Sequence, residues 1–263
     1  MSIGFIGCGN MATAIIKGII KSKTVEENEI NVFDVYAPAV ERLTAEYKIN
    51  KCESECDVVS SSDAVILAVK PNVLPQVLNK INTTLEESDT LLISIAAGKS
   101  TEFIRGALSH NNRIIRVMPN INATVGEAMC AYTANADATE EDKQTAEAIF
   151  SGVGKVMYLD ENYFPLFGVI GGCGPAFAYM FIDARAGVKN GMKKDTALMV
   201  AAQTVLGSAK MILDSSEHPW ELIDKVCSPG GTTIEAVTSL QADGFESAIH
   251  NAIDKAVDKD SKL

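Results

Sequence analysis

The first twelve residues constrain the fold more than any other segment of this chain. An apolar run, Ile3–Ile6, leads directly into the sequence GCGNMA at residues 7–12, and a segment with helical periodicity follows at once. In this G-x-G-x-x-A pattern, the first glycine permits a tight turn and the second lets a ligand approach the backbone. The small third residue lets the helix pack closely on the strand. The segment therefore predicts a strand–turn–helix unit that holds a dinucleotide pyrophosphate at the N-terminus of the helix.

Strand-like and helix-like segments alternate through the first part of the chain. Short apolar runs rich in β-branched residues are typical of strands buried on both faces of a parallel sheet, and the helical segments between them imply right-handed crossovers. We therefore expect an α/β fold with a Rossmann-like, doubly wound, mainly parallel sheet. The expected strands are 3–6, 30–33, 64–69, 90–95, 114–117 and 154–158, and the expected helices are 11–20, 40–47, 73–81, 101–108 and 139–150.

The pattern changes after about residue 160, where strand-like runs end. Two long Ala- and Met-rich helices are expected at 175–189 and 196–213, followed by shorter helices at 219–225, 232–240 and 245–257. This organisation predicts a dinucleotide-binding domain over residues 1–158 and an all-helical domain over residues 159–263. The two long helices are too apolar for a lone surface hairpin, so we expect them to pack against a second subunit.

Charge and cysteine content exclude several classes of partner. The chain has 23 Lys and Arg residues against 34 Asp and Glu residues, a net charge of −11. This balance disfavours nucleic acid and anionic membranes, which need clustered cations. No apolar run approaches the roughly 18 to 20 residues of a membrane span. The six cysteines are scattered without a zinc-binding pattern. We expect a cytoplasmic protein with free thiols and no metal.

Asp34 ends the second expected strand, roughly 20 residues beyond the glycine-rich loop, where an acidic residue binds the ribose hydroxyls of NAD. A carboxylate at this position repels the 2′-phosphate of NADPH, and no arginine follows closely in the sequence. Asp34 therefore predicts a preference for NADH. The alternative interpretation is that Asp34 caps the turn before Pro38.

Further motifs extend the pattern over nearly the full chain. They are AVKP at 68–71, SIAAG at 94–98, RVMPN at 116–120, GPAF at 174–177, GSAKM at 207–211 and SPGGTTI at 228–234. Together with the glycine-rich loop, and in this order, they resemble the pyrroline-5-carboxylate reductase family. The resemblance implies a nicotinamide-binding domain followed by a helical dimerisation domain, with homodimers that assemble into larger rings. It also implies that NAD(P)H reduces the cyclic imine 1-pyrroline-5-carboxylate to L-proline.

The cofactor-binding residues are expected at the carboxyl ends of the strands, where ligands bind in an open α/β sheet. Two segments follow strands at this edge, AVKP at 68–71 and the two alanines at 96–97, and Lys70 is the one cation in them. The alternative interpretation of Lys70 is a solvated lysine before a proline. The resemblance implies that these segments line the cofactor. The expected cofactor contacts are Gly7, Cys8, Gly9, Asn10, Met11, Asp34, Ala68, Val69, Lys70, Pro71, Ala96 and Ala97.

The segment 228–233 is the candidate substrate loop. Its proline and glycines favour a turn, and exposed N–H groups at the following helix start can bind a carboxylate. The resemblance implies that Thr233 is catalytic and bonds the ring nitrogen. A threonine hydroxyl is too weak an acid to protonate an amine, so Thr233 either orients a nitrogen already protonated or relays a proton from water. The alternative is an ordinary helix cap. The expected substrate contacts are Ser228, Gly230, Gly231, Thr232 and Thr233.

One segment departs from the family. Residues 168–173, GVIGGC, lack three hydroxyls that the family commonly has, and Cys173 replaces a serine. This departure keeps open a related imine or β-hydroxy-acid reductase that acts on another small carboxylate. A non-catalytic dinucleotide-binding protein is a third alternative, against which the intact substrate loop argues.

Overall fold

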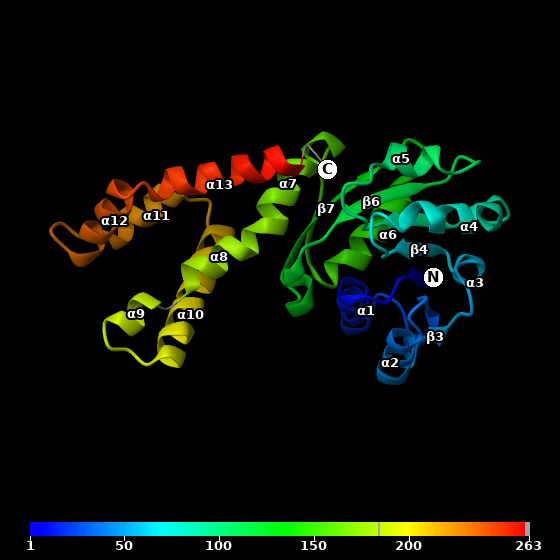
Figure 1. Cartoon of the computed structure of the whole chain (residues 1–263), viewed down its shortest axis with the longest axis horizontal. Helices are drawn as coiled ribbons and strands as arrows, with labels where there is room; N and C mark the ends of the chain where they lie inside the picture. The colour runs from blue at the N-terminus through cyan, green and yellow to red at the C-terminus, as the bar shows by residue number, and fades with distance from the viewer. Residues whose placement is uncertain (184, 261–263) are drawn as a thin grey trace. The chain divides into compact units, whose positions relative to one another are not determined.

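The computed structural model describes residues 1–183 and 185–260 (Figure 1). The chain divides into two compact units, and the boundary in the sequence falls between Gly172 and Cys173. The N-terminal unit begins at Met1 and the C-terminal unit begins at Cys173.

The described part of the N-terminal unit contains an eight-stranded sheet in the order β3-β2-β1-β4-β5-β6-β7-β8. The pairs from β3 to β6 are parallel, β6 pairs antiparallel with β7, and β7 pairs parallel with β8. The expected Rossmann-like, mainly parallel sheet is confirmed. The strands are β1 (Ile3–Ile6), β2 (Ile30–Phe33), β3 (Asn50–Lys51), β4 (Ala64–Leu67), β5 (Leu91–Ser94), β6 (Ile114–Met118), β7 (Ala128–Ala134) and β8 (Gly154–Tyr158).

Helices cover both faces of this sheet, because its strands are apolar on both faces. Val65 and Leu67 of β4 belong to one buried cluster and Ala64 and Ile66 to another, as expected where successive side chains point to opposite faces. α1 and α6 contribute to the cluster with Ile66, and α3, α4 and α5 to the cluster with Leu67. The helices are α1 (Asn10–Ser22), α2 (Ala37–Tyr47), α3 (Glu55–Ser60), α4 (Leu74–Glu86), α5 (Thr101–Gly106) and α6 (Glu140–Ser151).

Several elements of this unit were not anticipated from the sequence, among them β3, α3 and β7. β3 and α3 have only 2 and 6 residues, too few to show a period. β7 has the sequence AMCAYTA, whose small residues lack the β-branched signal, although most of it is buried between β6 and β8. The sheet thus ends in a pair of strands that run against the others.

The C-terminal unit is entirely helical in its described part, as expected. The predicted single helix 175–189 is wrong, because α8 ends at Ile182 and Asp183 has a non-helical ψ of 106°. The Asp183 carboxylate pairs with the Arg185 guanidinium, where α9 begins. The helices are α8 (Gly174–Ile182), α9 (Arg185–Lys189), α10 (Lys194–Asp214), α11 (Pro219–Val226), α12 (Thr232–Ala242) and α13 (Phe245–Asp260).

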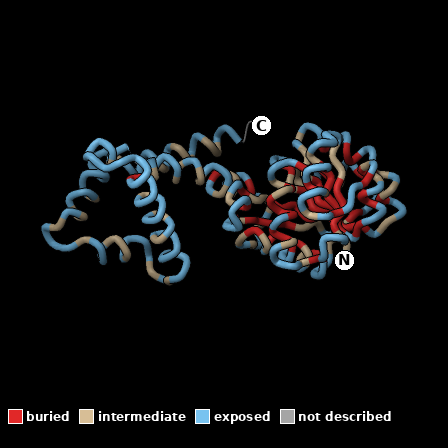
Figure 2. Tube along the Cα trace, turned by 90° about the horizontal axis from the view of Figure 1, so that it is seen from below, coloured by how far each residue is buried: buried red, intermediate tan, exposed pale blue. Residues whose placement is uncertain are grey.

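The described helices of the C-terminal unit have almost no core of their own. Among their described residues only Ala197 is buried, whereas Met180 and Leu213 are 79% and 77% exposed (Figure 2). Helices with this much exposed apolar surface require another apolar surface to cover them.

The expectation that no apolar run approaches the length of a membrane span needs correction. Among the described residues, Glu161–Lys189 and Lys194–Asp214 are long and apolar enough to do so by length and composition alone. Glycine residues interrupt the first of these segments, and Gly207, Ser208 and Lys210 interrupt the second, but the mean hydropathy of each stays high. Apolar helices that pack inside soluble proteins meet the same criterion, so this observation is weak evidence for a membrane.

Candidate active site

The glycine-rich loop has a backbone that requires glycine at its first position. Gly7 has a φ of +104°, and a Cβ atom there would lie 2.5 Å from the carbonyl oxygen of Ala68. The Gly7 N–H donates to the carbonyl of Phe33 at 2.8 Å. The turn is therefore fixed against the ends of both β2 and β4, which flank β1.

The start of α1 is open to a ligand. Gly9 is the N-cap residue of this 13-residue helix and provides no side-chain cap. A Cβ atom at Gly9 would meet nothing within 4 Å, so another molecule can approach the backbone closely. Ala12, by contrast, is buried in the core against the sheet. The free N–H groups of the first turn of α1 can bind an anion such as a pyrophosphate.

A cavity of about 210 Å³ lies beside this helix at the carboxyl ends of β4, β5 and β6. It brings together several residues that the sequence predicted, but Lys70 and Pro71 are not among the described residues that line it. Lys70 is exposed, and its carbonyl accepts the N–H groups of Val73 and Leu74 where α4 begins. The lining residues are Met11, Ala68, Val69, Ile95, Ala96, Ala97, Arg116, Val117, Met118 and Pro119.

Arg116 is the cation on the wall of this cavity, and its role was not predicted. Its Nη1 atom donates to Glu161 Oε1 at 2.9 Å, and its guanidinium lies 4.5 Å from the centre of the Phe164 ring. Glu161 also accepts the backbone N–H and the hydroxyl of Thr101, at 2.8 and 2.7 Å. This network attaches the segment before α7 (Phe164–Phe167) to β6 and to the start of α5.

Asp34 has both carboxylate oxygens anchored. Oδ2 accepts the N–H of Cys8 at 2.6 Å, and Oδ1 accepts the N–H of Tyr36 at 2.8 Å. Asp34 therefore caps the turn at Tyr36, as the alternative interpretation of this residue predicted. Each oxygen retains a lone pair, so the carboxylate can still accept a hydrogen bond from a ribose hydroxyl.

An arginine lies closer to this region than the sequence suggested. Arg42 extends from α2 and donates from Nη2 to Thr13 Oγ1 on α1 at 3.3 Å. The positive charge of Arg42 also acts to lower the pKa of the Cys8 thiol in the loop, against larger effects that raise it. Arg42 of α2 therefore lies beside α1 in space, although the sequence alone gave no sign of this.

Burial, followed by the charge of Asp34, raises the pKa of Cys8 from 9.0 to about 12. The thiol is therefore neutral in the folded protein. Burial of the neutral Cys8 thiol contributes fully to the free energy of unfolding below pH 9. This contribution is lost as the pH rises towards about 12, because the thiol of the unfolded chain then ionises.

We expect iodoacetamide at pH 8 to leave Cys8 unmodified in the native protein and to modify Cys56, because alkylation requires an accessible thiolate. Cys8 is buried, whereas Cys56 is only partly buried. Mass spectrometry of the digested protein measures both, and denaturant provides the control in which both react. Native modification of Cys8 at the rate of Cys56 would contradict the burial of the loop.

The predicted substrate loop forms a turn that leads into α12. The Gly231 N–H donates to the Ser228 carbonyl at 3.0 Å, and Gly230 has a φ of +67°. A turn with Pro229 at its second position and a positive φ at its third fits this sequence. Gly231 is the N-cap of α12 without a side-chain cap, so the N–H groups of Thr232 and Thr233 face no capping group.

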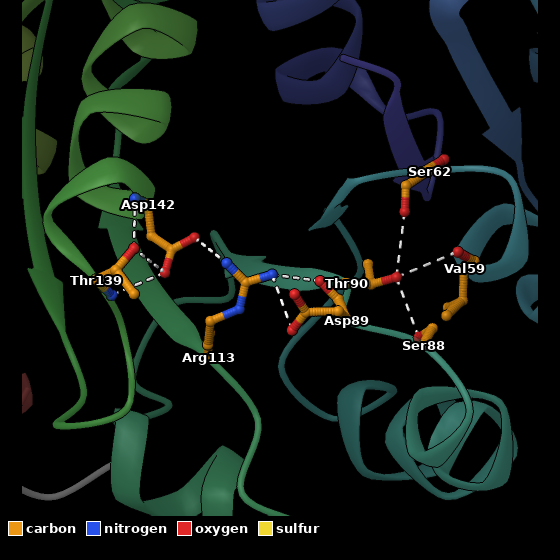
Figure 3. Close-up of polar contacts among 8 residues, drawn as sticks. All are labelled: Val59, Ser62, Ser88, Asp89, Thr90, Arg113, Thr139 and Asp142. Atoms are coloured by element: carbon orange, nitrogen blue, oxygen red, sulfur yellow. Dashed lines mark hydrogen bonds and ion pairs between the residues drawn. The ribbon is translucent and has the colours of Figure 1, made fainter.

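A second, larger cavity of about 770 Å³ lies at the opposite, amino edge of the sheet. Figure 3 shows that its polar groups bind one another: Arg113 Nη1 contacts Asp142 Oδ1 at 2.5 Å, and Asp142 Oδ2 accepts the N–H and hydroxyl of Thr139. Arg113 also pairs with Asp89. Ligands in open α/β sheets bind at the other edge, so we interpret this cluster as a structural clamp between β6 and α6.

Comparison with known proteins places these features in one family. Pyrroline-5-carboxylate reductase of Escherichia coli is 43% identical over 264 residues, which cover 99% of this chain and 97% of that protein. The chain belongs to the pyrroline-5-carboxylate reductase family. The family resemblance predicted from the motifs is thereby confirmed. The family model for pyrroline-5-carboxylate reductase dimerisation matches residues 161–263, and the model for NADP oxidoreductase, coenzyme F420-dependent, matches residues 2–98.

Solved structures of pyrroline-5-carboxylate reductases have the same fold. The enzyme from Coxiella burnetii has a TM-score of 0.94 at 30% identity and covers 99% of this chain and 97% of its own. The enzyme from Plasmodium falciparum, solved with NADP bound, has a TM-score of 0.87 at 30% identity, with the same coverage of both chains.

The residues present fit a nicotinamide dinucleotide. The open first turn of α1 suits the pyrophosphate, and the small cavity beside it has largely apolar walls. In addition, the buried Oδ1 atom of Asn120, the residue after Pro119, has no hydrogen-bond partner among the described residues.

Proposed function

We propose that this chain reduces 1-pyrroline-5-carboxylate to L-proline with a reduced nicotinamide dinucleotide. The observation that carries this function is the full-length family membership at 43% identity. The dinucleotide loop and the turn before α12, the two segments that such a reaction needs most, both support it.

The protein's contribution to the reaction is binding and orientation, since the cofactor when bound supplies the hydride. The backbone N–H groups after Gly9 bind the pyrophosphate. Met118 and Pro119 on one side of the cavity and Ala96 and Ala97 on another confine the reacting ring. Fixing two reactants in a productive arrangement can lower the barrier substantially without any ionisable catalyst.

The turn before α12 supplies the substrate site in this proposal. N–H groups at the start of α12 hold the substrate carboxylate, where the helix dipole favours negative charge. The Thr233 hydroxyl accepts a hydrogen bond from the protonated ring nitrogen and thereby orients the C=N bond. Ser228 and Gly230 shape the turn, and Gly231 and Thr232 present its N–H groups.

We further propose that Asp34 favours NADH over NADPH and that Arg42 maintains a residual use of NADPH. Asp34 places negative charge where the 2′-phosphate of NADPH would lie, and Arg42 places a cation near the same end of the loop.

We expect Asp34→Asn to raise kcat/KM with NADPH relative to NADH by about tenfold, because it removes the repulsion of the phosphate. Arg42→Met is expected to lower kcat/KM with NADPH only. Initial rates with each cofactor measure both effects. Equal or better efficiency of the unmodified enzyme with NADPH would contradict the preference.

The C-terminal helices support a homodimer, and we propose that such dimers assemble into a ring. The matching family model is that of a dimerisation domain, and the apolar residues of α8 and α10 are exposed in a single chain. We expect sedimentation to give at least twice the 28.1 kDa of one chain at every concentration. A monomer that persists as the concentration is raised would contradict this assembly.

The segment 168–173 supports one alternative, a related imine or β-hydroxy-acid reductase with another small carboxylate as substrate. A Cβ atom at Gly168 would lie 3.1 Å from Met118 Sδ, so the altered segment packs on the wall of the cavity. Assays with other cyclic imines and with keto acids distinguish the two functions. Higher kcat/KM with one of these than with 1-pyrroline-5-carboxylate would favour the alternative.

We also propose that the protein works in a reducing compartment such as the cytoplasm, since all six cysteines are free.

A further inference from the structure

Arg116 has the one charged side chain on the wall of the cavity at the carboxyl ends of β4, β5 and β6. Every other described residue that lines this cavity is uncharged. Arg116 is only 7% exposed, so water and salt screen its charge weakly. A buried cation beside a small cavity makes the cavity electrically positive, unless a group of opposite charge lies close to it.

Glu161 is that group. Its Oε1 atom accepts Arg116 Nη1 at 2.9 Å. The backbone N–H and the hydroxyl of Thr101 hold the same carboxylate in place, at 2.8 and 2.7 Å. Glu161 is not among the described residues that line the cavity, and its side chain is 28% exposed. The pair is therefore neutral as a whole, but only its cationic member belongs to the cavity wall.

The charge of a nicotinamide ring depends on its redox state. The ring is positively charged in NAD⁺ and uncharged in NADH, whereas the rest of the dinucleotide is the same in both. A charge on the cavity wall therefore changes the affinity for NAD⁺ far more than the affinity for NADH. We define the affinity ratio as the Kd of NAD⁺ divided by the Kd of NADH. This ratio reports the charge of the wall, and effects common to both ligands cancel in it.

We propose that the Arg116–Glu161 pair sets the relative affinity of this cavity for oxidised and reduced cofactor. This inference rests on the proposed function, because it assumes a nicotinamide ring in the cavity. The carboxylate neutralises the cation, so the wall does not repel the oxidised ring. Without the carboxylate, Arg116 would favour NADH over NAD⁺ and would oppose the positive charge that develops on the ring during the reaction. Glu161 acts through Arg116 and is a positioning residue in this account.

The test measures the affinity ratio by calorimetry without substrate. In Glu161→Gln we expect the ratio to rise about tenfold, the size expected for one unit charge roughly 10 Å away at an effective dielectric constant of about 20. In Arg116→Met we expect the opposite change, a fall of about threefold. This change is smaller because the charge left over is then the carboxylate, which is more exposed and does not line the cavity.

Two further variants separate charge from shape. The double variant Glu161→Gln, Arg116→Met has no charge at either position, so its affinity ratio should return to within about twofold of the unmodified value. Thr101→Val is the matched control. It removes a hydrogen bond to the same carboxylate but no charge, so its ratio should also stay within about twofold. If Glu161→Gln does not fold, Arg116→Met still makes its own prediction of a lower ratio.

A purely structural role of the network predicts no reversal of sign between the two single variants. An unchanged affinity ratio in the folded variants, or a change in the same direction in both, would overturn the inference and leave the proposed function intact. Failure of the unmodified protein to bind NADH and NADPH at all would instead overturn the proposed function, and this inference with it.

Discussion

Gly7→Ala is expected to abolish measurable NADH binding and to lower the free energy of unfolding by about 3 to 5 kcal/mol. An alanine at a φ of +104° is strained, and its Cβ atom would lie 2.5 Å from the carbonyl oxygen of Ala68. The clash is with backbone, so it can be relieved only by moving β1 away from the end of β4. Thermal unfolding measures the stability, and fluorescence quenching measures NADH binding.

Gly9→Ala is the matched control for this prediction. A Cβ atom at Gly9 meets nothing within 4 Å, and its φ is −72°, so stability should change by less than about 1 kcal/mol. NADH affinity should still fall by about tenfold or more, because the methyl group occupies the path of the pyrophosphate. Similar loss of stability in both variants would show that the two glycines do not divide their roles in this way.

Thr233→Val is expected to lower kcat/KM for 1-pyrroline-5-carboxylate by about 100-fold, within the range for one group that orients a reacting atom. Valine has nearly the shape of threonine and lacks only the hydroxyl. The dissociation constant of NADH should not change, since Thr233 is assigned to the substrate rather than to the cofactor. Steady-state kinetics and cofactor titration separate these two effects.

Thr238→Val tests whether the loss is specific to the position. Thr238 is an exposed threonine on the same helix, and its hydroxyl donates to the backbone within α12. This variant should retain activity within about twofold, because surface substitutions rarely have larger effects. If Thr233→Val retained unmodified turnover and substrate affinity, the catalytic assignment of Thr233 would be wrong.

The sequence predicts the central strands well, because they are buried on both faces. β1 and β2 begin and end at the predicted residues, since Ile3–Ile6 and Ile30–Phe33 are apolar runs bounded by polar or turn residues. β7 escapes prediction because its burial comes from β6 and β8 rather than from its own composition. The break between α8 and α9 escapes because Asp183 is also compatible with a helix.

The candidate site likewise has parts that the sequence predicts and parts that it does not. Local motifs predict the glycine-rich loop and the turn before α12, because each is a backbone conformation encoded by neighbouring glycines. Arg42 and the network of Arg116, Glu161 and Thr101 depend on residues far apart in the chain, and no local pattern encodes them. Asn120 belongs to a visible motif, but only the structure shows that its amide oxygen has no hydrogen-bond partner among the described residues.

The net charge of −11 does not prevent this chain from binding the two proposed ligands. Both proposed ligands are anions, a pyrophosphate and a small carboxylate. Each is assigned to uncapped N–H groups at a helix start, at α1 and at α12. Local dipoles can therefore bind these anions on an acidic protein, although the overall charge gives no long-range attraction.

The central claim is best tested by incubating the purified protein with 1-pyrroline-5-carboxylate and NADH, and measuring L-proline formed against NADH consumed. We expect one L-proline for each NADH consumed, with NADPH supporting a slower reaction. No L-proline with either cofactor, from folded protein that binds NADH, would contradict it.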